Sequence, residues 1–277
     1  MEQLAKAQKI FDRLWEDYTS RNPAVKKVYD LFVSQGENVV NDHIAFRTFN
    51  DPRVNIDVFS KPFVEAGYEY KGEYEFKTKH LYARHFEFKA FRSAPRVFIS
   101  QLILEDFSPF LQHTIRQIID RIPEFTLKPE NLIFAENAWG TPSYEIYQKL
   151  RSESEYAAWV YVHGYRANHF TVSINDLQKF NSIYQVNGFL KDNGFHLNDS
   201  DGEVKGTPEE LLEQSSIKSG IIDVEFKEGT YPVPSCYYEF ARRYPDKEGN
   251  LYLGFIAKSA DKIFESTDFY EKKPTDK

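Results

Sequence analysis

The feature that most constrains the fold is an order of elements that occurs twice along the chain. Alternating polar and apolar residues predict strands, and apolar residues at three- and four-residue spacing predict helices. The first copy reads as a strand, a helix and three more strands, at 41–49, 55–66, 68–76, 79–88 and 96–104. The second copy repeats this order, at 168–174, 177–191, 195–197, 220–226 and 235–242. The first strands of the two copies begin alike, with Asp42-His43-Ile44 and Asn168-His169-Phe170.

This order predicts a duplicated βαβββ module in one α+β domain. We expect the two modules to form curved mixed sheets around a central metal cavity, with added helical layers. The expected parts are N-terminal helices, a first module, a helical insertion, a second module and a tail, at 1–40, 41–104, 105–165, 166–257 and 258–277. Thr207-Pro208-Glu209-Glu210 has the form of a helix start. Alternating apolar residues at 251–257 predict a last strand.

Composition excludes several classes of protein. With 277 residues, 41% of them hydrophobic, the chain is able to bury a substantial core. A net charge of −7 argues against a general nucleic-acid surface. No run of eighteen apolar residues predicts a membrane span, and the charged N-terminus lacks a signal-peptide core, so we expect a cytoplasmic protein. The single cysteine, Cys236, excludes an intramolecular disulfide and a multi-cysteine zinc site, which leaves nitrogen and oxygen as metal ligands.

Three residues in the strand-like stretches have the chemistry of a metal site. Alternation along 41–49 places His43 and Arg47 on one face and apolar side chains on the other. His169 lies in the matching strand, and Glu239 lies in an aromatic strand near the end of the second module. Two histidines and one carboxylate are the ligands of the facial triad of non-haem Fe(II) oxygenases. The corresponding strand of the first module offers Ser100 and Gln101, so we expect three ligands and an open site.

Each of these residues also has a structural interpretation. A histidine within an apolar strand is more often a hydrogen-bonded core residue than a ligand. Glu239 would be costly to bury alone, and Arg242 or Arg243 could pair with it instead of a metal. Arg47 could also be a buried ion-pair residue. His163, six residues before His169, is the alternative histidine ligand.

The three motifs together resemble a known family. His43 with Arg47, Asn168-His169-Phe170-Thr171, and the run at 237–243 are similar to motifs of the 2-oxoadipate dioxygenase/decarboxylase family, the hydroxyglutarate synthases. The resemblance covers about 22–255 and implies a fold like that of the vicinal-oxygen-chelate superfamily. It implies an Fe(II) cofactor held by His43, His169 and Glu239. Arg47 falls where the family contacts a substrate carboxylate.

The resemblance implies an enzyme with a small-molecule 2-oxo acid and O2 as its partners. A 2-oxo (di)carboxylic acid such as 2-oxoadipate would become a 2-hydroxy acid such as 2-hydroxyglutarate, with O2 uptake and CO2 release. Two alternatives remain: a metal-dependent isomerase or hydrolase of the glyoxalase type, and a non-catalytic small-molecule binding module. The chain is shorter than the long family members, so we expect no clear counterpart here for the pocket contacts of their extra C-terminal region.

Overall fold

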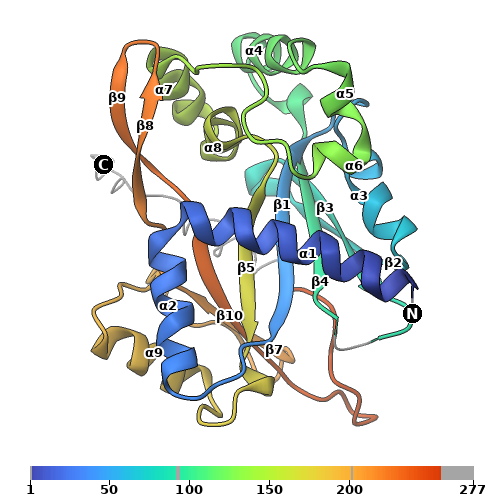
Figure 1. The fold of residues 1–277 in the computed structure, drawn as a ribbon, viewed down its shortest axis with the longest axis vertical. Coiled ribbons are helices and arrows are strands. Elements are labelled where there is room, and N and C mark those ends of the chain that lie inside the picture. Colours follow the sequence, from blue (N-terminus) through green and yellow to red (C-terminus); the bar gives the residue numbers. More distant parts are fainter. Residues whose placement is uncertain (1, 92–93, 201, 257–277) are drawn as a thin grey trace.

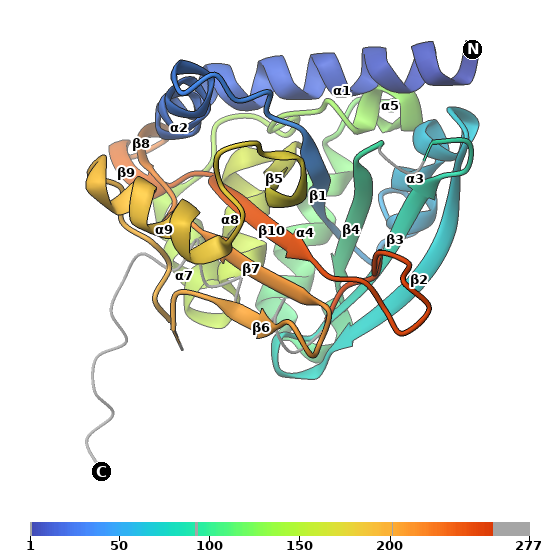
Figure 2. The same ribbon diagram turned by 90° about the horizontal axis from the view of Figure 1, so that it is seen from below.

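One continuous sheet of eight strands forms the centre of the computed structural model, which describes residues 2–91, 94–200 and 202–256. The strands lie in the order β2-β3-β4-β1-β5-β10-β7-β6, and the sheet curls into an arc that is open on one side (Figure 2). Their bounds, in this spatial order, are Tyr68–Phe76, Leu81–Phe88, Arg96–Leu102, Asn41–Phe49, Ala167–Ser173, Tyr237–Arg243, Leu212–Ser216 and Lys205–Thr207.

The sheet consists of two βαβββ halves, as the sequence predicted. One half is β1, α3 (Ile56–Glu65), β2, β3 and β4, and the other is β5, α9 (Ile183–Asp192), β6, β7 and β10. The first strands, β1 and β5, pair antiparallel at the centre, and each has the last strand of its own half beside it in parallel. His43 lies opposite Thr171 and His169 opposite Ala45, which is the register of a local two-fold axis. The halves therefore share one sheet, whereas the sequence suggested separate sheets.

The second half differs in detail from the prediction. The helix expected after Thr207 is a turn, because Thr207 pairs with Leu212 and the turn joins β6 to β7. The stretch expected as the third strand of this half is β8 (Ile221–Phe226), which among the described residues pairs only with β9 (Gly229–Pro234), in a separate hairpin between β7 and β10 in the sequence. Strands were also predicted at 195–197 and 251–257, but the described residues there form only isolated bridges. Residue 257 and the predicted tail lie outside the described residues.

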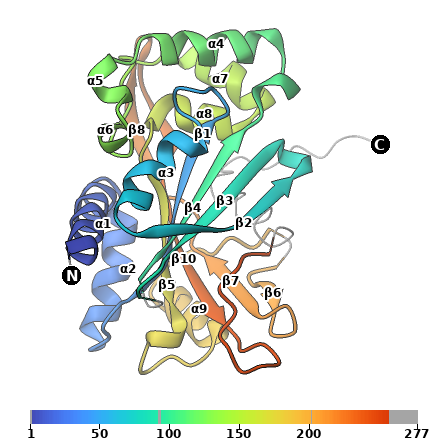
Figure 3. The same cartoon turned by 90° about the vertical axis from the view of Figure 1, so that its right-hand side faces the viewer.

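Aromatic packing joins the outer, convex face of the sheet to the helices. The long helix α1 (Glu2–Arg21) runs along this face next to α2 (Pro23–Ser34) (Figures 2 and 3). Helix α3 packs against β2 and β4, and α9 packs against β7 and β10. The ring of Trp15 in α1 lies 5.0 Å from that of Phe170 in β5 and 5.9 Å from that of Tyr238 in β10. Because side chains alternate along a strand, this packing turns His43, His169 and Glu239 towards the inner face.

The insertion between the halves is helical and covers one end of the sheet (Figure 1). Its helices are α4 (Pro109–Asp120), α5 (Glu124–Leu127), α6 (Pro129–Leu132), α7 (Tyr144–Glu153) and α8 (Glu155–His163). The insertion predicted as helical at 105–165 is confirmed, and its last helix, α8, begins after the N-cap Ser154, which accepts a hydrogen bond from the backbone of Ala157. Within the described part of the chain, each helix is too short or too polar to cross a membrane.

Candidate metal centre

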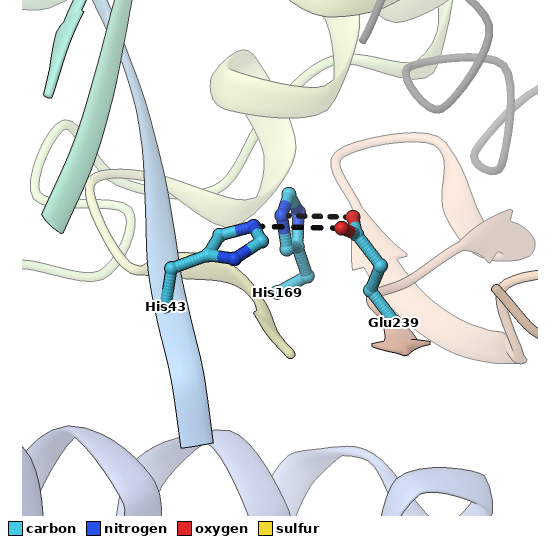
Figure 4. Close-up of side chains that lie close together, drawn as sticks. All are labelled: His43, His169 and Glu239. Carbon is cyan, nitrogen blue, oxygen red and sulfur yellow. Dashed lines mark ion pairs between the residues drawn. The ribbon is translucent and has the colours of Figure 1, made fainter. Parts of the chain in front are cut away.

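The sheet brings His43, His169 and Glu239 together on its inner face. The three side chains come from β1, β5 and β10, which are adjacent strands, and one donor atom from each lies within 4.8 Å of the others. Figure 4 shows both imidazoles directed at the Glu239 carboxylate. His43 Nε2 lies 3.5 Å from Glu239 Oε1, and His169 Nε2 lies 3.3 Å from Glu239 Oε2. The predicted candidates therefore converge in space.

Asp42 fixes the orientation of His43. The pairing of β1 with β5 skips Asp42, so this residue is an extra one in a β-bulge, which re-aims its side chain. Asp42 Oδ1 lies 2.7 Å from His43 Nδ1. An ionised carboxylate only accepts hydrogen bonds, so Nδ1 carries the proton and the lone pair of Nε2 faces the cavity.

Two arginines keep Asp42 ionised. Arg243 donates to both of its oxygens, at 2.7 and 2.9 Å, and Arg96 donates to Oδ2 at 3.1 Å. Burial alone would raise the pKa of Asp42, but the two guanidinium groups hold that pKa well below its usual value. Arg243 is thus the partner of Asp42, and neither it nor Arg242 forms an ion pair with Glu239 in the described structure. The alternative interpretation, in which Arg242 or Arg243 pairs with Glu239 in place of a metal, is therefore wrong.

His169 is held in the same way by a neutral partner. The Asn168 side-chain oxygen accepts a hydrogen bond from His169 Nδ1 at 3.1 Å, which turns Nε2 towards Glu239. Burial lowers the pKa of His169 well below its usual value, and burial also lowers the pKa of His43. Both imidazoles are therefore neutral, which is the form that binds a metal.

Glu239 is fully buried and lacks a full set of donors. Gln214 of β7 donates to Oε1 at 2.5 Å, while Oε2 has no hydrogen-bond donor among the described residues. Burial raises the pKa of Glu239 to about 8. At neutral pH Glu239 therefore retains a proton unless a cation is bound beside it. A divalent cation between the carboxylate and the two imidazole lone pairs would replace this proton, and the hydroxyl of Thr171, 3.1 Å from His43 Nε2, is the other donor near the ligands. The donor set fits a divalent metal ion with open positions.

Arg47 lies on the same face, towards the helical insertion. It is 2% exposed, and its guanidinium carbon is 5.1 Å from the ring centres of both Tyr156 and Trp159. Burial lowers the pKa of Arg47. Its charge in turn contributes to the lowered pKa of His169. Arg47 therefore supplies a buried positive charge within electrostatic reach of the triad.

The remaining sequence candidates occupy other positions. The Nε2 atom of His163 lies 2.8 Å from the Pro234 carbonyl oxygen, and its ring packs at a tilt against that of Trp159, so His163 does not join the triad. Phe98 is the first-half counterpart of Glu239. Phe98 lies opposite Ala45, two residues after His43, and Glu239 lies opposite Thr171, two residues after His169. The predicted counterparts, Ser100 and Gln101, lie further along β4. A phenylalanine at this position leaves three candidate ligands.

Sequence reasoning missed the residues that support the triad. Asp42 and Asn168 form the repeated pattern of an acid or amide directly before each histidine, and this pattern could have identified both. Gln214 had no such signal, because its strand follows the stretch that was interpreted as a helix. Phe255, whose ring lies 4.8 Å from that of His43, comes from an irregular segment whose position depends on tertiary packing.

Comparisons with known proteins agree with this geometry. From Oryza sativa, a curated 2-oxoadipate dioxygenase/decarboxylase is 37% identical over 93% of this chain and 78% of its own length. A crystal structure of the rice hydroxyglutarate synthase with 2-oxoadipate aligns with a TM-score of 0.87 and 34% identity, over 94% of this chain and 91% of that one.

Two other solved structures are similar. A protein from Shewanella frigidimarina, provisionally described as a hydrolase, is 48% identical with a TM-score of 0.86, over 91% of this chain and 98% of that one. A protein from Ralstonia eutropha, provisionally assigned to the glyoxalase superfamily, has a TM-score of 0.71 at 20% identity, over 93% of this chain and 88% of that one. The latter likeness supports the expected vicinal-oxygen-chelate type of fold.

The family model for 2-oxoadipate dioxygenase/decarboxylase matches residues 10–246. This range includes both histidine strands and the strand of Glu239. Because the match spans most of the chain and the rice relatives are similar over almost all of it, this chain belongs to the 2-oxoadipate dioxygenase/decarboxylase family.

Proposed function

We propose that this protein is an Fe(II)-dependent dioxygenase/decarboxylase of a 2-oxo dicarboxylic acid such as 2-oxoadipate. The products would be CO2 and a 2-hydroxy acid one carbon shorter, such as 2-hydroxyglutarate, with both oxygen atoms of O2 incorporated in the products. The observation that carries this proposal is the buried convergence of His43, His169 and Glu239. The family membership of the chain supports the same reaction.

Fe(II) is the metal that this donor set favours among oxygenases. Two neutral imidazoles and one carboxylate on adjacent strands form a facial ligand set and leave positions open. When bound there, Fe(II) would supply the electrons and the open ligand positions that dioxygen chemistry needs. Asp42 and Asn168 orient the two imidazoles, and Gln214 orients the carboxylate, so the ligands are held before the metal arrives.

The chain also supplies the means to bind a dianionic substrate. Arg47 would pair with the carboxylate that is remote from the metal, because it is a buried cation on the same face as the triad. On another side, the ring of Phe255 packs 4.8 Å from that of His43 and 4.9 Å from that of Phe98. These aromatic side chains exclude water next to the ligands, which strengthens the interactions within the site.

A hydrolase that uses the same metal site is the second candidate, because the Shewanella relative is provisionally described as a hydrolase. Such an enzyme would activate water and would not consume O2. The three-ligand site is compatible with this chemistry as well, so consumption of O2 separates the two candidates. A non-catalytic binding module would have residues that do not converge or would hold no metal after purification; the three residues converge, and metal analysis of the purified protein tests the second condition.

The test is anaerobic loading with Fe(II), followed by measurement of O2 uptake and CO2 release with 2-oxoadipate. We expect equal amounts of O2 consumed and CO2 released, and the loss of both, together with bound iron, in His169→Ala. His163→Gln is the matched control, because it alters a buried histidine outside the triad. Iron binding without consumption of any 2-oxo acid would refute the proposed reaction. The predicted cytoplasmic location is a separate proposal, which cell fractionation would test.

A further inference from the structure

Tyr237 is a second polar side chain between the triad and Arg47. It lies two residues before Glu239 in β10 and therefore on the same face of the sheet. Tyr237 pairs in register with His169, and the two rings stack with centres 4.6 Å apart at 30°. On the other side of His169 in the sheet lies Ala45, and Arg47 is two residues further along β1. Both Glu239 and Arg47 are close enough to Tyr237 to act on the pKa of its phenol, so Tyr237 lies near the metal ligands and near Arg47.

The hydroxyl of Tyr237 lacks the partner that buried tyrosines ordinarily have. Tyr18 and Tyr156 are also buried, and their hydroxyls donate to the backbone oxygens of Tyr237 and Ser100. Tyr237 is fully buried, and Arg47 lies within hydrogen-bonding reach of its hydroxyl. A guanidinium only donates hydrogen bonds, so the hydroxyl proton of Tyr237 has no acceptor among the described residues. An unsatisfied buried hydroxyl is costly, so a position that retains one indicates a partner that is not part of the chain.

Two other buried tyrosines share this property but face elsewhere. Tyr238 points to the outer face, where its ring lies 5.9 Å from that of Trp15 in α1. Tyr165 packs against Phe59 of α3, with ring centres 5.7 Å apart. Among these three, Tyr237 is the one beside the metal ligands.

We propose that Tyr237 donates a hydrogen bond to the substrate carboxylate that Arg47 binds, and so makes the site selective for dicarboxylic 2-oxo acids. This inference rests on the proposed function. A buried carboxylate has several acceptor positions, and one guanidinium does not satisfy them all. A phenol adds a neutral donor without adding charge, and its stacking on His169 fixes where the hydroxyl lies. Tyr237 is thus assigned as a specificity residue and not as a metal ligand.

The experiment measures equilibrium binding of two acids of equal chain length to the Fe(II)-loaded protein without O2. 2-Oxoadipate ends in a carboxylate, and 2-oxohexanoate ends in a methyl group. We expect Tyr237→Phe to weaken binding of 2-oxoadipate about ten- to hundredfold, the size of a hydrogen bond to a charged group. Binding of 2-oxohexanoate should change less than about twofold, because the phenylalanine keeps the stacking on His169.

Tyr238→Phe is the matched control, since it removes the same hydroxyl from a buried tyrosine of the same strand on the opposite face. Equal affinities of Tyr237→Phe and Tyr238→Phe for 2-oxoadipate would overturn the proposal. An equal loss for both acids would also overturn it, because Tyr237 would then act through His169. O2 consumption by the wild type is measured separately. If the wild type binds 2-oxoadipate but consumes no O2, the proposed reaction is refuted and the binding assay still tests Tyr237. If the wild type does not bind 2-oxoadipate, the proposed reaction and the role of Tyr237 are both refuted.

Discussion

Asp42→Ala is the change whose effects the structure separates most clearly. It removes the acceptor of His43 Nδ1, and it also removes the one carboxylate that both Arg243 and Arg96 contact. Asn168→Ala makes the same kind of change at the other histidine, because it removes the acceptor of His169 Nδ1. Asn168 carries no charge, so the two variants differ in whether buried cations lose their counter-ion.

The magnitudes follow from this difference. Loss of a group that orients a metal-bound histidine typically lowers metal affinity about ten- to hundredfold, so both variants should bind Fe(II) more weakly by that factor. Removing one partner of a buried ion pair costs about 3 to 5 kcal/mol, and Arg243 and Asp42 are each at most 4% exposed. Removing the neutral hydrogen bond of Asn168 should cost about 1 kcal/mol. Asp42→Ala should therefore be less stable than Asn168→Ala by about 2 to 4 kcal/mol.

Chemical denaturation of metal-free protein in the presence of a chelator measures the stability difference without the contribution of metal binding. Competition against a chromophoric chelator measures metal affinity. The contribution of Asp42 to wild-type stability should persist at neutral pH and be lost only in strong acid, because its pKa in the folded state lies well below the usual value. Equal stabilities of the two variants would refute the view that Asp42 neutralises the buried arginines. Unchanged metal affinity in both would refute the orienting role.

Three further predictions concern neighbouring groups. Burial lowers the pKa of His163 to about 3, so this residue should cost the folded protein about 2 kcal/mol between pH 7 and pH 5, and denaturation of His163→Gln should show acid sensitivity reduced by that amount. Gln214→Leu removes the donor to Glu239 Oε1 and should weaken Fe(II) binding at least about tenfold in the chelator competition, with an unchanged value counting against its role. Arg47→Lys should retain iron but bind 2-oxoadipate at least about tenfold more weakly by calorimetry, since lysine cannot form a bidentate pair, and wild-type affinity would remove Arg47 from the carboxylate site.

The first half of the fold could be predicted from the sequence because its elements are long and regular. Strands β1 and β2 each have nine residues, so their alternation is easy to recognise. Helix α3 begins after the capping residue Asn55, and Gly67, with φ of 106°, follows its end. Local signals and tertiary structure agree in this half.

The second half was harder because local signals compete with tertiary structure. Strand β6 has three residues, too few for alternation to appear. The residues after Thr207 have the pattern of a helix start, but β7 is buried along its whole length and pairs on both sides, with β6 and β10. Burial and pairing of a whole strand outweigh the modest preference of a few turn residues. The stretch at 220–226, which was expected in the main sheet, instead forms β8 and pairs with β9 in a separate hairpin.

The candidate triad could be predicted from the sequence because alternation and residue type are local properties, whereas its supporting residues depend on the relation between the halves. The local two-fold axis makes His43 equivalent to His169, Asp42 to Asn168 and Phe98 to Glu239. Duplication alone would therefore produce a symmetric site, and the open positions arise where the two copies differ. Asp42 brings a buried ion-pair cluster to one histidine, while Asn168 leaves the other without charge. The strand that carries His43 also carries Arg47, whose counterpart in β5 by the same relation is Ser173. The substitutions that distinguish the halves thus supply the third candidate ligand, the side of the triad without a ligand, and the buried cation that we propose binds the substrate.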